Sequence, residues 1–289
     1  MRYLNAGDTR ACLPMTAAIE AMEQAFTRES EAPLRSLVGG SLVMPGRVGD
    51  TMAVKVVSVV PGNPAGLVAV FGIDGSPIGL VEGPTLTSIR TGAVCGLATR
   101  LLAPEGVSTL AMLGAGAMAF DQIEAIRAVR PLDRILVWSR SIDKARSLAD
   151  RIGGAAVSDI DEAVSEADVV SCATPARAAL FADSSVRSGT HVNAVGAFTP
   201  EMVELPAGLL SRSFVVVDDI DAAAGEAGDL LQAGRDPDAT LSDLLRGSRT
   251  APEGSPTVFK SVGVAAQDVA AAAMALRVAE EEDLGTVLR

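Results

Sequence analysis

The residues best placed to do chemistry form a glycine turn in the middle of the chain. An apolar run ends at Gly114, Gly116 follows, and Ala119 takes a third small position. In this spacing the first glycine permits a tight turn, the second lets phosphates approach the backbone, and the third small residue lets a helix pack on a strand. We therefore expect a dinucleotide site here, contacted by Gly114, Gly116, Ala117 and Met118. A purely structural glycine turn is the alternative.

The pattern on either side of the turn supports the dinucleotide interpretation. Leu110–Leu113 predicts a buried strand, and Phe120–Val129 predicts a helix that ends before Pro131. Ile135–Trp138 predicts the next strand. Together these segments predict the βαβ unit in which such a turn binds a dinucleotide.

The end of the second strand should select the cofactor. An acidic residue there accepts the ribose 2′-hydroxyl of NAD, whereas a nearby arginine suits the 2′-phosphate of NADP. The sequence has Ser139, Arg140 and Ser141 at this point and no carboxylate before Asp143. Arg140 can pair with the phosphate while both serines donate hydrogen bonds. We expect NADP(H) to be preferred, with NAD(H) as the other possible cofactor. The simpler alternative is a solvated surface arginine.

Later strands alternate with helices. The sequence predicts these strands at Ala155–Val157, Val169–Ala173, His191–Val195 and Phe214–Val217. Such alternation is typical of an α/β protein with a doubly wound parallel sheet. Because these folds bind ligands beyond the carboxyl ends of the strands, we expect Thr174 and Val195 to contact the cofactor as well.

The first third of the chain has a different pattern. A helix is expected over Pro14–Arg28, and turn signals at Pro61–Pro64 and Asp74–Gly75 separate valine-rich runs. These runs predict an antiparallel meander with strands at Thr51–Val59, Ala65–Ile73 and Pro77–Glu82. Further helices are expected over Leu86–Leu102 and Gln267–Glu281.

The two patterns predict a domain inserted in another. Residues 107–263 would form a Rossmann domain that binds NAD(P). Residues 1–106 and 264–289 would form an α+β domain with an antiparallel sheet, because domain termini often lie close together.

Three basic residues could bind an anionic substrate. Lys55 lies inside a valine-rich strand, Arg90 lies near the start of an apolar helix, and Arg35 lies in a predicted loop. A buried ammonium needs an anion or a solvated cleft. Alone, each is most simply a surface cation or half of an ion pair. Together they could form a clamp for a carboxylate.

Composition excludes other classes of protein. The net charge of −12 argues against nucleic acid and anionic membranes as partners. The first residues lack a signal-peptide pattern, and no apolar run reaches the ~18 residues of a membrane span. The single histidine, His191, begins an apolar strand and is more simply structural than catalytic. No cluster has metal-ligand spacing, so we expect no metal. Three separated cysteines fit a reducing compartment, and we expect a cytoplasmic protein.

Longer motifs carry a resemblance to the ornithine cyclodeaminase/μ-crystallin family. It covers nearly the whole chain, in order and at similar spacing. The matching segments are Lys55, Pro61-Gly-Asn-Pro64, Gly66-Leu67, Gly79, Glu82-Gly-Pro-Thr-Leu-Thr-Ser-Ile-Arg-Thr-Gly92, Gly114-Ala-Gly-Ala-Met-Ala119, His191-Val-Asn-Ala-Val-Gly196, Glu204-Leu205, Gly225-Glu-Ala-Gly228 and Thr257-Val-Phe-Lys-Ser-Val-Gly263.

The resemblance implies a homodimer whose subunits each have a substrate and dimerisation domain and a Rossmann domain. Members of the family use NAD(H) or NADP(H) and act on amino acids or cyclic imines. By similarity, Arg35, Lys55 and Arg90 match basic residues around the substrate carboxylate, and Thr91 matches a threonine near the cofactor phosphates. Lys55 and Arg90 are accordingly our candidate catalytic residues.

One position departs from the cyclodeaminases. These carry an aspartate after the Ala-Val-Gly strand end that acts on the substrate amine, and Phe198 stands at the matching place here. A phenylalanine cannot transfer a proton, a function typically worth 10²–10⁴ in rate. The variant resembles bacterial reductases of Δ1-pyrroline-2-carboxylate and its six-membered analogue, Δ1-piperideine-2-carboxylate, and Phe198 could form an apolar wall for the ring.

The resemblance thus favours a ketimine reductase that forms L-proline, or L-pipecolate from the larger ring. Three alternatives stay open. They are an alanine or N-alkyl-amino-acid dehydrogenase, a non-catalytic NADP-binding protein of the crystallin kind, and an ornithine cyclodeaminase.

Overall fold

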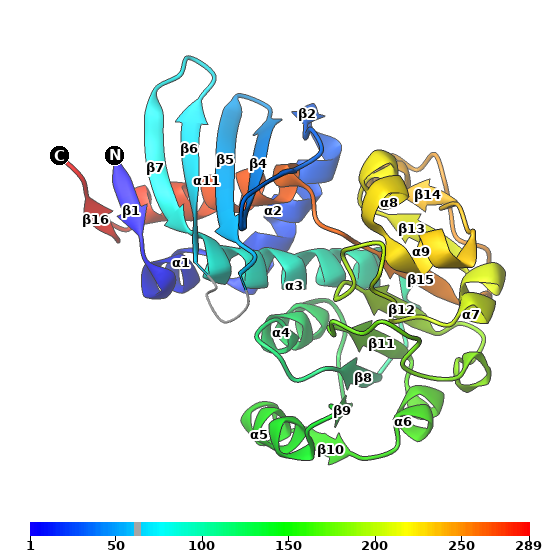
Figure 1. Cartoon of the computed structure of the whole chain (residues 1–289). Helices are drawn as coiled ribbons and strands as arrows, with labels where there is room; N and C mark the ends of the chain where they lie inside the picture. Colours follow the sequence, from blue (N-terminus) through cyan, green and yellow to red (C-terminus); the bar gives the residue numbers. More distant parts are fainter. Residues whose placement is uncertain (61–64) are drawn as a thin grey trace. The chain divides into compact units, whose positions relative to one another are not determined.

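A computed structural model describes residues 1–60 and 65–289. The chain forms two compact units, of residues 1–94 with 264–289 and of residues 95–263. We call them, after the roles expected from the sequence, the substrate unit and the cofactor unit and describe each by itself (Figure 1). The boundary falls within helix α3 (Gly83–Leu102), whereas a domain boundary at residues 106 and 107 stays a prediction.

The substrate unit contains a mostly antiparallel sheet with the strand order β16-β1-β7-β6-β5-β4-β2, and β3 also pairs with β4. β1 is parallel to β7. Its strands are β1 (Arg2–Leu4), β2 (Ser30–Glu31), β3 (Ser36–Val38), β4 (Ser41–Val48), β5 (Thr51–Ser58), β6 (Gly66–Gly72), β7 (Pro77–Glu82) and β16 (Thr286–Val287).

The predicted antiparallel meander is confirmed in β5, β6 and β7. The predicted turn at Pro61–Pro64 lies outside the described residues. Sequence reasoning missed β4, which turns directly into β5 at Gly49, a residue with a φ of 55°. That conformation suits glycine, because it has no Cβ to clash with the backbone.

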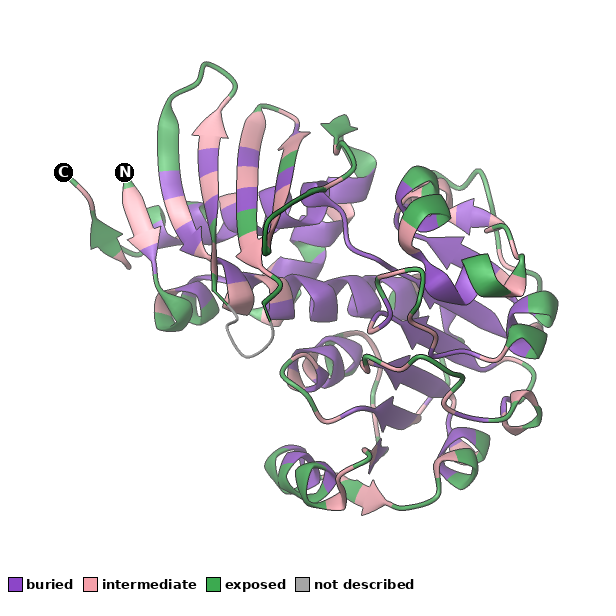
Figure 2. Cartoon of the chain, in the orientation of Figure 1, coloured by how far each residue is buried: buried purple, intermediate pink, exposed green. Residues whose placement is uncertain are grey.

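Helices α1 (Ala6–Cys12), α2 (Met15–Thr27) and α11 (Ala265–Glu281) also belong to this unit. α11 contacts α2 and strands β4, β5 and β6, and Figure 2 shows it as mostly buried. Its small side chains allow a close approach. A Cβ on Gly46 would lie 2.8 Å from the Cβ of Ala265, and one on Gly79 would lie 2.5 Å from a methyl group of Leu276. α11 therefore lies close against the sheet both at its first turn and at Leu276.

Helix α3 begins at Gly83, before the predicted start at Leu86. Pro84 is tolerated in a first helical turn because the N–H it lacks would have no helical partner. The Glu82 carboxylate accepts a hydrogen bond from the Thr85 N–H at 2.7 Å and satisfies another free donor there.

The cofactor unit contains a parallel sheet with the order β10-β9-β8-β11-β12-β15-β13-β14. Its strands are β8 (Thr109–Leu113), β9 (Arg134–Trp138), β10 (Ala155–Val157), β11 (Val169–Cys172), β12 (His191–Ala194), β13 (Phe214–Val217), β14 (Ala239–Thr240) and β15 (Thr257–Lys260). Its helical segments, after α3, are α4 (Ala119–Val129), α5 (Ile142–Ile152), α6 (Ile160–Glu166), η1 (Asp183–Ser185), α7 (Ala207–Arg212), α8 (Ile220–Glu226), α9 (Gly228–Ala233) and α10 (Leu241–Leu245).

This sheet confirms the predicted doubly wound α/β class, alongside the antiparallel sheet of the other unit. The strand order reverses at β8, which lies between β9 and β11. Ligands of such folds bind beyond the carboxyl ends of the strands at this point. Sequence reasoning missed β15, which pairs with both β12 and β13. No helix in the described ranges, 1–60 and 65–289, is long and apolar enough to cross a membrane.

Candidate cofactor and substrate sites

The predicted glycine turn joins β8 to α4. Gly114 has a φ of 116°, and a Cβ there would lie 2.6 Å from the carbonyl oxygen of Ala173, so only glycine fits. A Cβ on Gly116 would meet no atom within 4 Å. Gly116 therefore leaves open space beside the backbone rather than fitting against a protein neighbour. Ala119 begins α4 and is fully buried, as the third small position of the motif requires.

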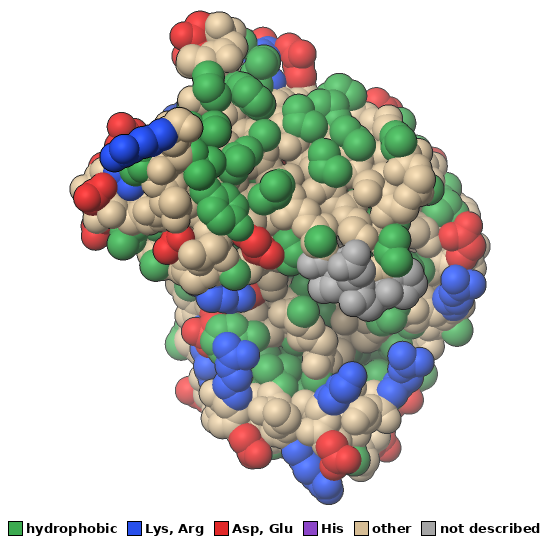
Figure 3. Space-filling view, turned by 60° about the vertical axis from the view of Figure 1, so that its left-hand side comes forward, with side chains coloured by type: hydrophobic (Ala, Val, Ile, Leu, Met, Phe, Trp, Pro, Cys, Tyr) green, Lys and Arg blue, Asp and Glu red, His purple; other side chains and the backbone are tan. Residues whose placement is uncertain are grey.

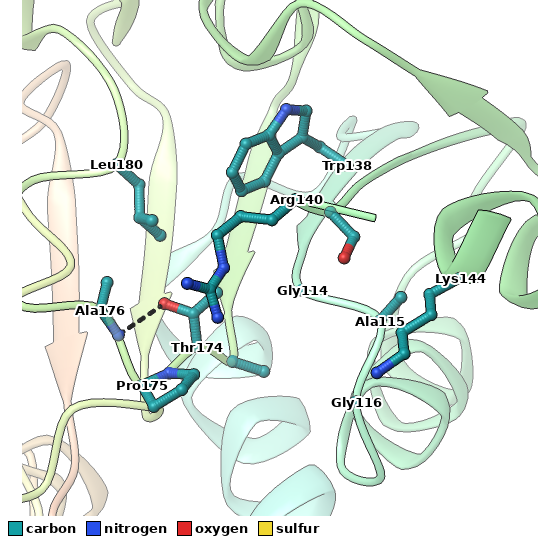
Figure 4. Close-up of a pocket in the computed structure, with 12 residues that line it drawn as sticks. Gly114, Ala115, Gly116, Trp138, Arg140, Lys144, Thr174, Pro175, Ala176 and Leu180 are labelled. Atoms are coloured by element: carbon teal, nitrogen blue, oxygen red, sulfur yellow. Dashed lines mark hydrogen bonds between the residues drawn. The ribbon is translucent and has the colours of Figure 1, made fainter. Parts of the chain in front are cut away.

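A cavity of about 290 Å³ lies over this turn, at the carboxyl ends of β8, β9 and β11 (Figure 4). Of the predicted cofactor residues, it brings together Gly114, Gly116, Ser139, Arg140 and Thr174. These side chains and glycines come from three strand ends that are neighbours at the reversal of strand order. A glycine turn that lines a cavity and leads into the N-terminus of α4 fits the pyrophosphate of a dinucleotide.

Two cations line the cavity, and one of them was missed in the sequence. Arg140 points toward Thr174 and Pro175, while Lys144 points toward Gly116 (Figure 4). Lys144 lies in the first turn of α5, whose N-cap is Ser141. A lysine in the first turn of the helix that follows the second strand was the signal that could have identified it.

Other predicted cofactor residues lie outside this lining. Ala117 and Met118 precede α4, and Ser141 accepts a hydrogen bond from the Lys144 N–H at 3.4 Å. Val195 is buried directly after β12, and Thr91 is buried in α3 within the substrate unit. Cofactor contact by these residues stays a prediction.

A buried carboxylate that sequence reasoning did not assign to the site organises the end of the cofactor cavity. Glu204 is fully buried, and its Oε1 accepts hydrogen bonds from the N–H and the hydroxyl of Thr174 at 2.7 and 2.9 Å. Its Oε2 accepts from the N–H groups of Gly196 and Ala197 at 2.8 and 3.0 Å. Glu204 thus ties together the segments that follow β11 and β12.

A second buried pair supports Glu204. The Lys260 ammonium lies 2.7 Å from Oδ2 of Asp229 and also donates to the carbonyl of Ala197. Asp229 Oδ1 accepts from the Glu204 N–H at 2.6 Å. Burial raises the pKa of Glu204, while the positive charge of Lys260 acts against that rise. The network fixes the backbone just before Phe198, which is 37% exposed.

In the substrate unit, Lys55 on β5 and Arg90 on α3 meet at one oxygen. Lys55 Nζ lies 3.0 Å and Arg90 Nε lies 3.2 Å from Oδ1 of Asp268, in the first turn of α11. Arg90 Nη1 also donates to Oε1 of Gln267 at 2.6 Å. All four side chains are buried. The structure therefore brings together two of the three predicted basic residues, around a carboxylate that sequence reasoning missed.

Burial lowers the pKa of Lys55 to about 8. Asp268 acts against this by favouring the charged form, whereas the nearby positive charges of Arg90 and Arg35 lower the pKa further. Arg35 is half-buried in the loop between β2 and β3. All three predicted basic residues thus belong to one electrostatic environment within the substrate unit.

His191 is fully buried in β12. Its Nδ1 lies 2.9 Å from the Thr257 hydroxyl, and its Nε2 lies 3.2 Å from Oδ1 of Asn193. Burial lowers the pKa of His191 to about 4, so the ring is neutral at physiological pH. These contacts agree with a structural histidine. No group of histidine, cysteine and acidic side chains among the described residues is arranged to hold a metal ion.

Comparison with known proteins follows this geometry. The chain matches the model of the ornithine cyclodeaminase/mu-crystallin family over residues 5–282. It is 32% identical to a Delta(1)-pyrroline-2-carboxylate reductase of Bacillus cereus. That alignment of 321 positions covers 99% of this chain and 98% of the relative.

Two solved structures are similar over the whole chain. The Delta(1)-pyrroline-2-carboxylate reductase of Thermococcus litoralis, in complex with NADH and L-proline, has a TM-score of 0.93 and 29% identity, and the match covers 100% of both chains. An archaeal alanine dehydrogenase dimer with bound NAD has a TM-score of 0.92 and 25% identity, covering 100% of this chain and 99% of that chain. From the match over residues 5–282 and the full-length similarity, this chain belongs to the ornithine cyclodeaminase/mu-crystallin family.

Proposed function

We propose that this protein is an NAD(P)H-dependent reductase of cyclic ketimines that converts Δ1-pyrroline-2-carboxylate to L-proline. The observation that carries the proposal is the full-length similarity to a reductase in complex with NADH and L-proline. The chain supplies suitable groups for each ligand. A glycine cradle opens to a cavity in one unit, and two buried cations share a carboxylate in the other. The six-membered imine, which gives L-pipecolate, is a second candidate substrate.

The cofactor, when bound, supplies the hydride that adds to C2 of the imine. The protein's own task is to hold and orient the substrate. Arg90 would bind the substrate carboxylate, with Lys55 and Arg35 adding positive charge beside it. A cyclic iminium brings its own proton and positive charge, so reduction needs no carboxylate at the position of Phe198. That side chain is 37% exposed and would form an apolar wall for the ring.

NADP(H) is the cofactor we propose. Arg140 and Lys144 both line the cavity next to Ser139, and this part of the cavity lining contains no carboxylate. Two cations at the end of the second strand suit a 2′-phosphate, which carries extra negative charge relative to a ribose hydroxyl. The similar solved structures hold NADH or NAD, so NAD(H) is the alternative.

We also propose that the protein is a homodimer, and that the sheet of the substrate unit forms the interface. On the sheet face opposite Lys55, Val56 pairs with Leu67, and the two are 42% and 44% exposed. Figure 3 shows hydrophobic side chains gathered in the upper part of the view, at the height of β4–β7 in Figure 1. Exposed apolar patches are typical of protein interfaces. The similar archaeal alanine dehydrogenase is a dimer.

The cysteines bear on the compartment. Cys12, Cys95 and Cys172 are all buried thiols rather than halves of disulfides. Buried cysteines that form no disulfides suit a reducing compartment, and we propose the cytoplasm.

The same scaffold supports one second candidate. The similarity to an alanine dehydrogenase favours an amino-acid dehydrogenase that would join ammonia or methylamine to pyruvate. Arg35, Lys55 and Arg90 would bind the carboxylate of pyruvate equally well. The two candidate reactions therefore use the same basic residues and differ only in the substrate.

The deciding experiment follows NADPH absorbance with the purified protein and Δ1-pyrroline-2-carboxylate. NADH, pyruvate with ammonia or methylamine, and ornithine with NAD are run alongside. Consumption of NADPH with formation of L-proline supports the ketimine reductase. Turnover only with pyruvate and an amine selects the dehydrogenase, and release of ammonia from ornithine selects a cyclodeaminase. Tight NADPH binding with no turnover of any substrate would point to the non-catalytic crystallin-like alternative.

A further inference from the structure

Asp268 is a buried carboxylate with unused hydrogen-bonding capacity. Its side chain is 2% exposed, and its Oδ1 receives both Lys55 and Arg90. Its Oδ2 is buried and has no hydrogen-bond partner in the described part of the chain. Buried carboxylate oxygens are normally satisfied, so a buried oxygen without a partner calls for an explanation.

The hydrogen-bond partners of Asp268 differ from those of Glu204, another buried carboxylate described above, and the difference indicates its role. Glu204 uses both oxygens to accept hydrogen bonds from three backbone N–H groups and one hydroxyl. Such a carboxylate stabilises the fold by satisfying backbone donors. Asp268 instead pairs with two cations and leaves one oxygen unused. Its role therefore concerns the two cations rather than the backbone around it.

Without Asp268 the two cations would be poorly tolerated. Lys55 and Arg90 are 2% and 6% exposed, so water screens their mutual repulsion only weakly. The charged side chains that act on Lys55 are Asp268 from α11, Arg90 from α3 and Arg35 from the loop after β2. Its neighbours across β4 and β6 are Met44 and Val68, which carry no charge. Asp268 is thus the negative charge that Lys55 meets directly.

The shared oxygen of Asp268 also fixes how Lys55 and Arg90 lie relative to each other. Because one oxygen receives both donors, Lys55 and Arg90 are held side by side. An ammonium has three donors and a guanidinium five, so each side chain has N–H groups beyond those bonded to Asp268 and Gln267. With one negative and two positive charges, the trio carries a net charge of +1. A substrate carboxylate would meet two preorganised cations whose repulsion is already balanced.

We propose that Asp268 is a positioning residue of the substrate site, which holds Lys55 and Arg90 together and keeps Lys55 in its cationic form for the substrate carboxylate. This inference rests on the proposed function. The inference adds Asp268 to the residues of the proposed substrate site. This residue lies on α11, the helix near the C-terminus that packs against the sheet.

The test is Asp268→Asn in the full-length protein, compared with wild type over pH 6 to 9. The kcat/KM for the imine falls roughly 10- to 100-fold at pH 7.5, because the asparagine oxygen can still accept hydrogen bonds but no longer carries the negative charge that balances Lys55 and Arg90. At alkaline pH, kcat/KM of the variant begins to fall at a lower pH than in wild type, because Lys55 loses its proton more readily. At pH 6, kcat/KM partly recovers. Asp268→Glu keeps the charge and restores part of the activity.

The matched control is Glu281→Gln, the same chemical change at an exposed position of the same helix. This variant keeps the wild-type pH profile. A fall in kcat/KM by the same factor at every pH for Asp268→Asn, with an unshifted profile, overturns the proposal and indicates a merely structural carboxylate.

A binding measurement separates this inference from the proposed function. Pyrrole-2-carboxylate is a planar five-membered ring with a carboxylate at the same position as in the imine. It is titrated by calorimetry into wild type and into Asp268→Asn, in the presence of NADPH. Weaker binding to Asp268→Asn that recovers at low pH supports the inference, even where wild type turns over no imine. Equal binding to both proteins at every pH refutes it.

Discussion

Lys55 Nζ lies 3.0 Å from Oδ1 of Asp268, although 213 positions separate the two residues in the chain. Both side chains are 2% exposed. Breaking a buried ion pair by removing one partner typically costs about 3–5 kcal/mol, because the remaining charge is left uncompensated. This contact therefore ties the first turn of α11 to the centre of β5 and sets the charge of the predicted substrate clamp.

The clamp predicts a selective effect of Arg90→Ala. Loss of the guanidinium should lower kcat/KM for the imine by roughly 100-fold, because charge-assisted hydrogen bonds contribute about 1.5–3 kcal/mol each. The NADPH dissociation constant, measured by nicotinamide fluorescence, should stay at the wild-type value. Arg277→Ala removes an exposed arginine and is the control. Unchanged imine kinetics in Arg90→Ala would falsify the clamp.

The cofactor cavity predicts a change in cofactor preference. Arg140→Ala and Lys144→Ala should each raise the KM for NADPH roughly 10- to 100-fold, through loss of a charged contact to phosphate. The KM for NADH should change much less in Arg140→Ala, because NADH has no 2′-phosphate. Arg146→Ala serves as the control, because Arg146 is exposed on α5, the helix of Lys144, but does not line the cavity. Equal losses for both cofactors in Arg140→Ala would contradict a 2′-phosphate contact.

Glu204 predicts a coupled loss of stability and cofactor binding. Glu204→Ala leaves four buried or half-buried donors without their acceptor, so the free energy of unfolding should fall by about 3 kcal/mol or more. Because Thr174 lines the cavity, the KM for NADPH should also rise. Urea denaturation and steady-state kinetics measure both effects. The exposed Glu201→Gln is the control, and a Glu204→Ala variant with wild-type stability would show that the network is dispensable.

His191 predicts a dependence of stability on acid pH. Its pKa is about 4 in the folded protein, against 6.5 for an unperturbed histidine, so the unfolded chain binds more protons between these values. The free energy of unfolding should therefore fall as the pH drops from 6.5 toward 4, by on the order of 3 kcal/mol from this group. Urea midpoints at pH 7.5, 6 and 5 measure the slope. His191→Gln should be less stable at neutral pH but show a shallower slope, and an unchanged slope would assign the acid sensitivity to other groups.

The exposed sheet face predicts the oligomeric state. Val56→Glu and Leu67→Glu place charges on neighbouring strands of that face, where burial against a second copy would be costly. Sedimentation velocity should show a dimer for wild type and a monomer for the double variant. Ile220→Glu, at an exposed position of α8, should stay dimeric. A monomeric wild type would rule out the dimer, and a dimeric double variant would place the interface elsewhere.

The sequence by itself determined features that depend on neighbouring residues. The glycine turn could be predicted because Gly114 needs a positive φ and Ala119 a close packing, and both needs act within one βαβ unit. The antiparallel meander and the parallel strands could be predicted from runs of apolar residues between turns. The chemical types of Lys55, Arg90 and Arg140 were equally visible, because an unexpected charge in an apolar segment is a local signal.

Only the tertiary structure decided which side chains meet. Asp268 looks like an ordinary acidic residue in the first turn of a helix, and nothing near it in sequence indicates a contact with Lys55. Similarly, nothing near β15 in sequence indicates that it enters the sheet between β12 and β13. Local periodicity reports which face of an element is buried, but it carries no information about the element packed against that face. Pairings across two hundred residues are set by the packing of the whole unit, and that packing placed Asp268 between the two cations.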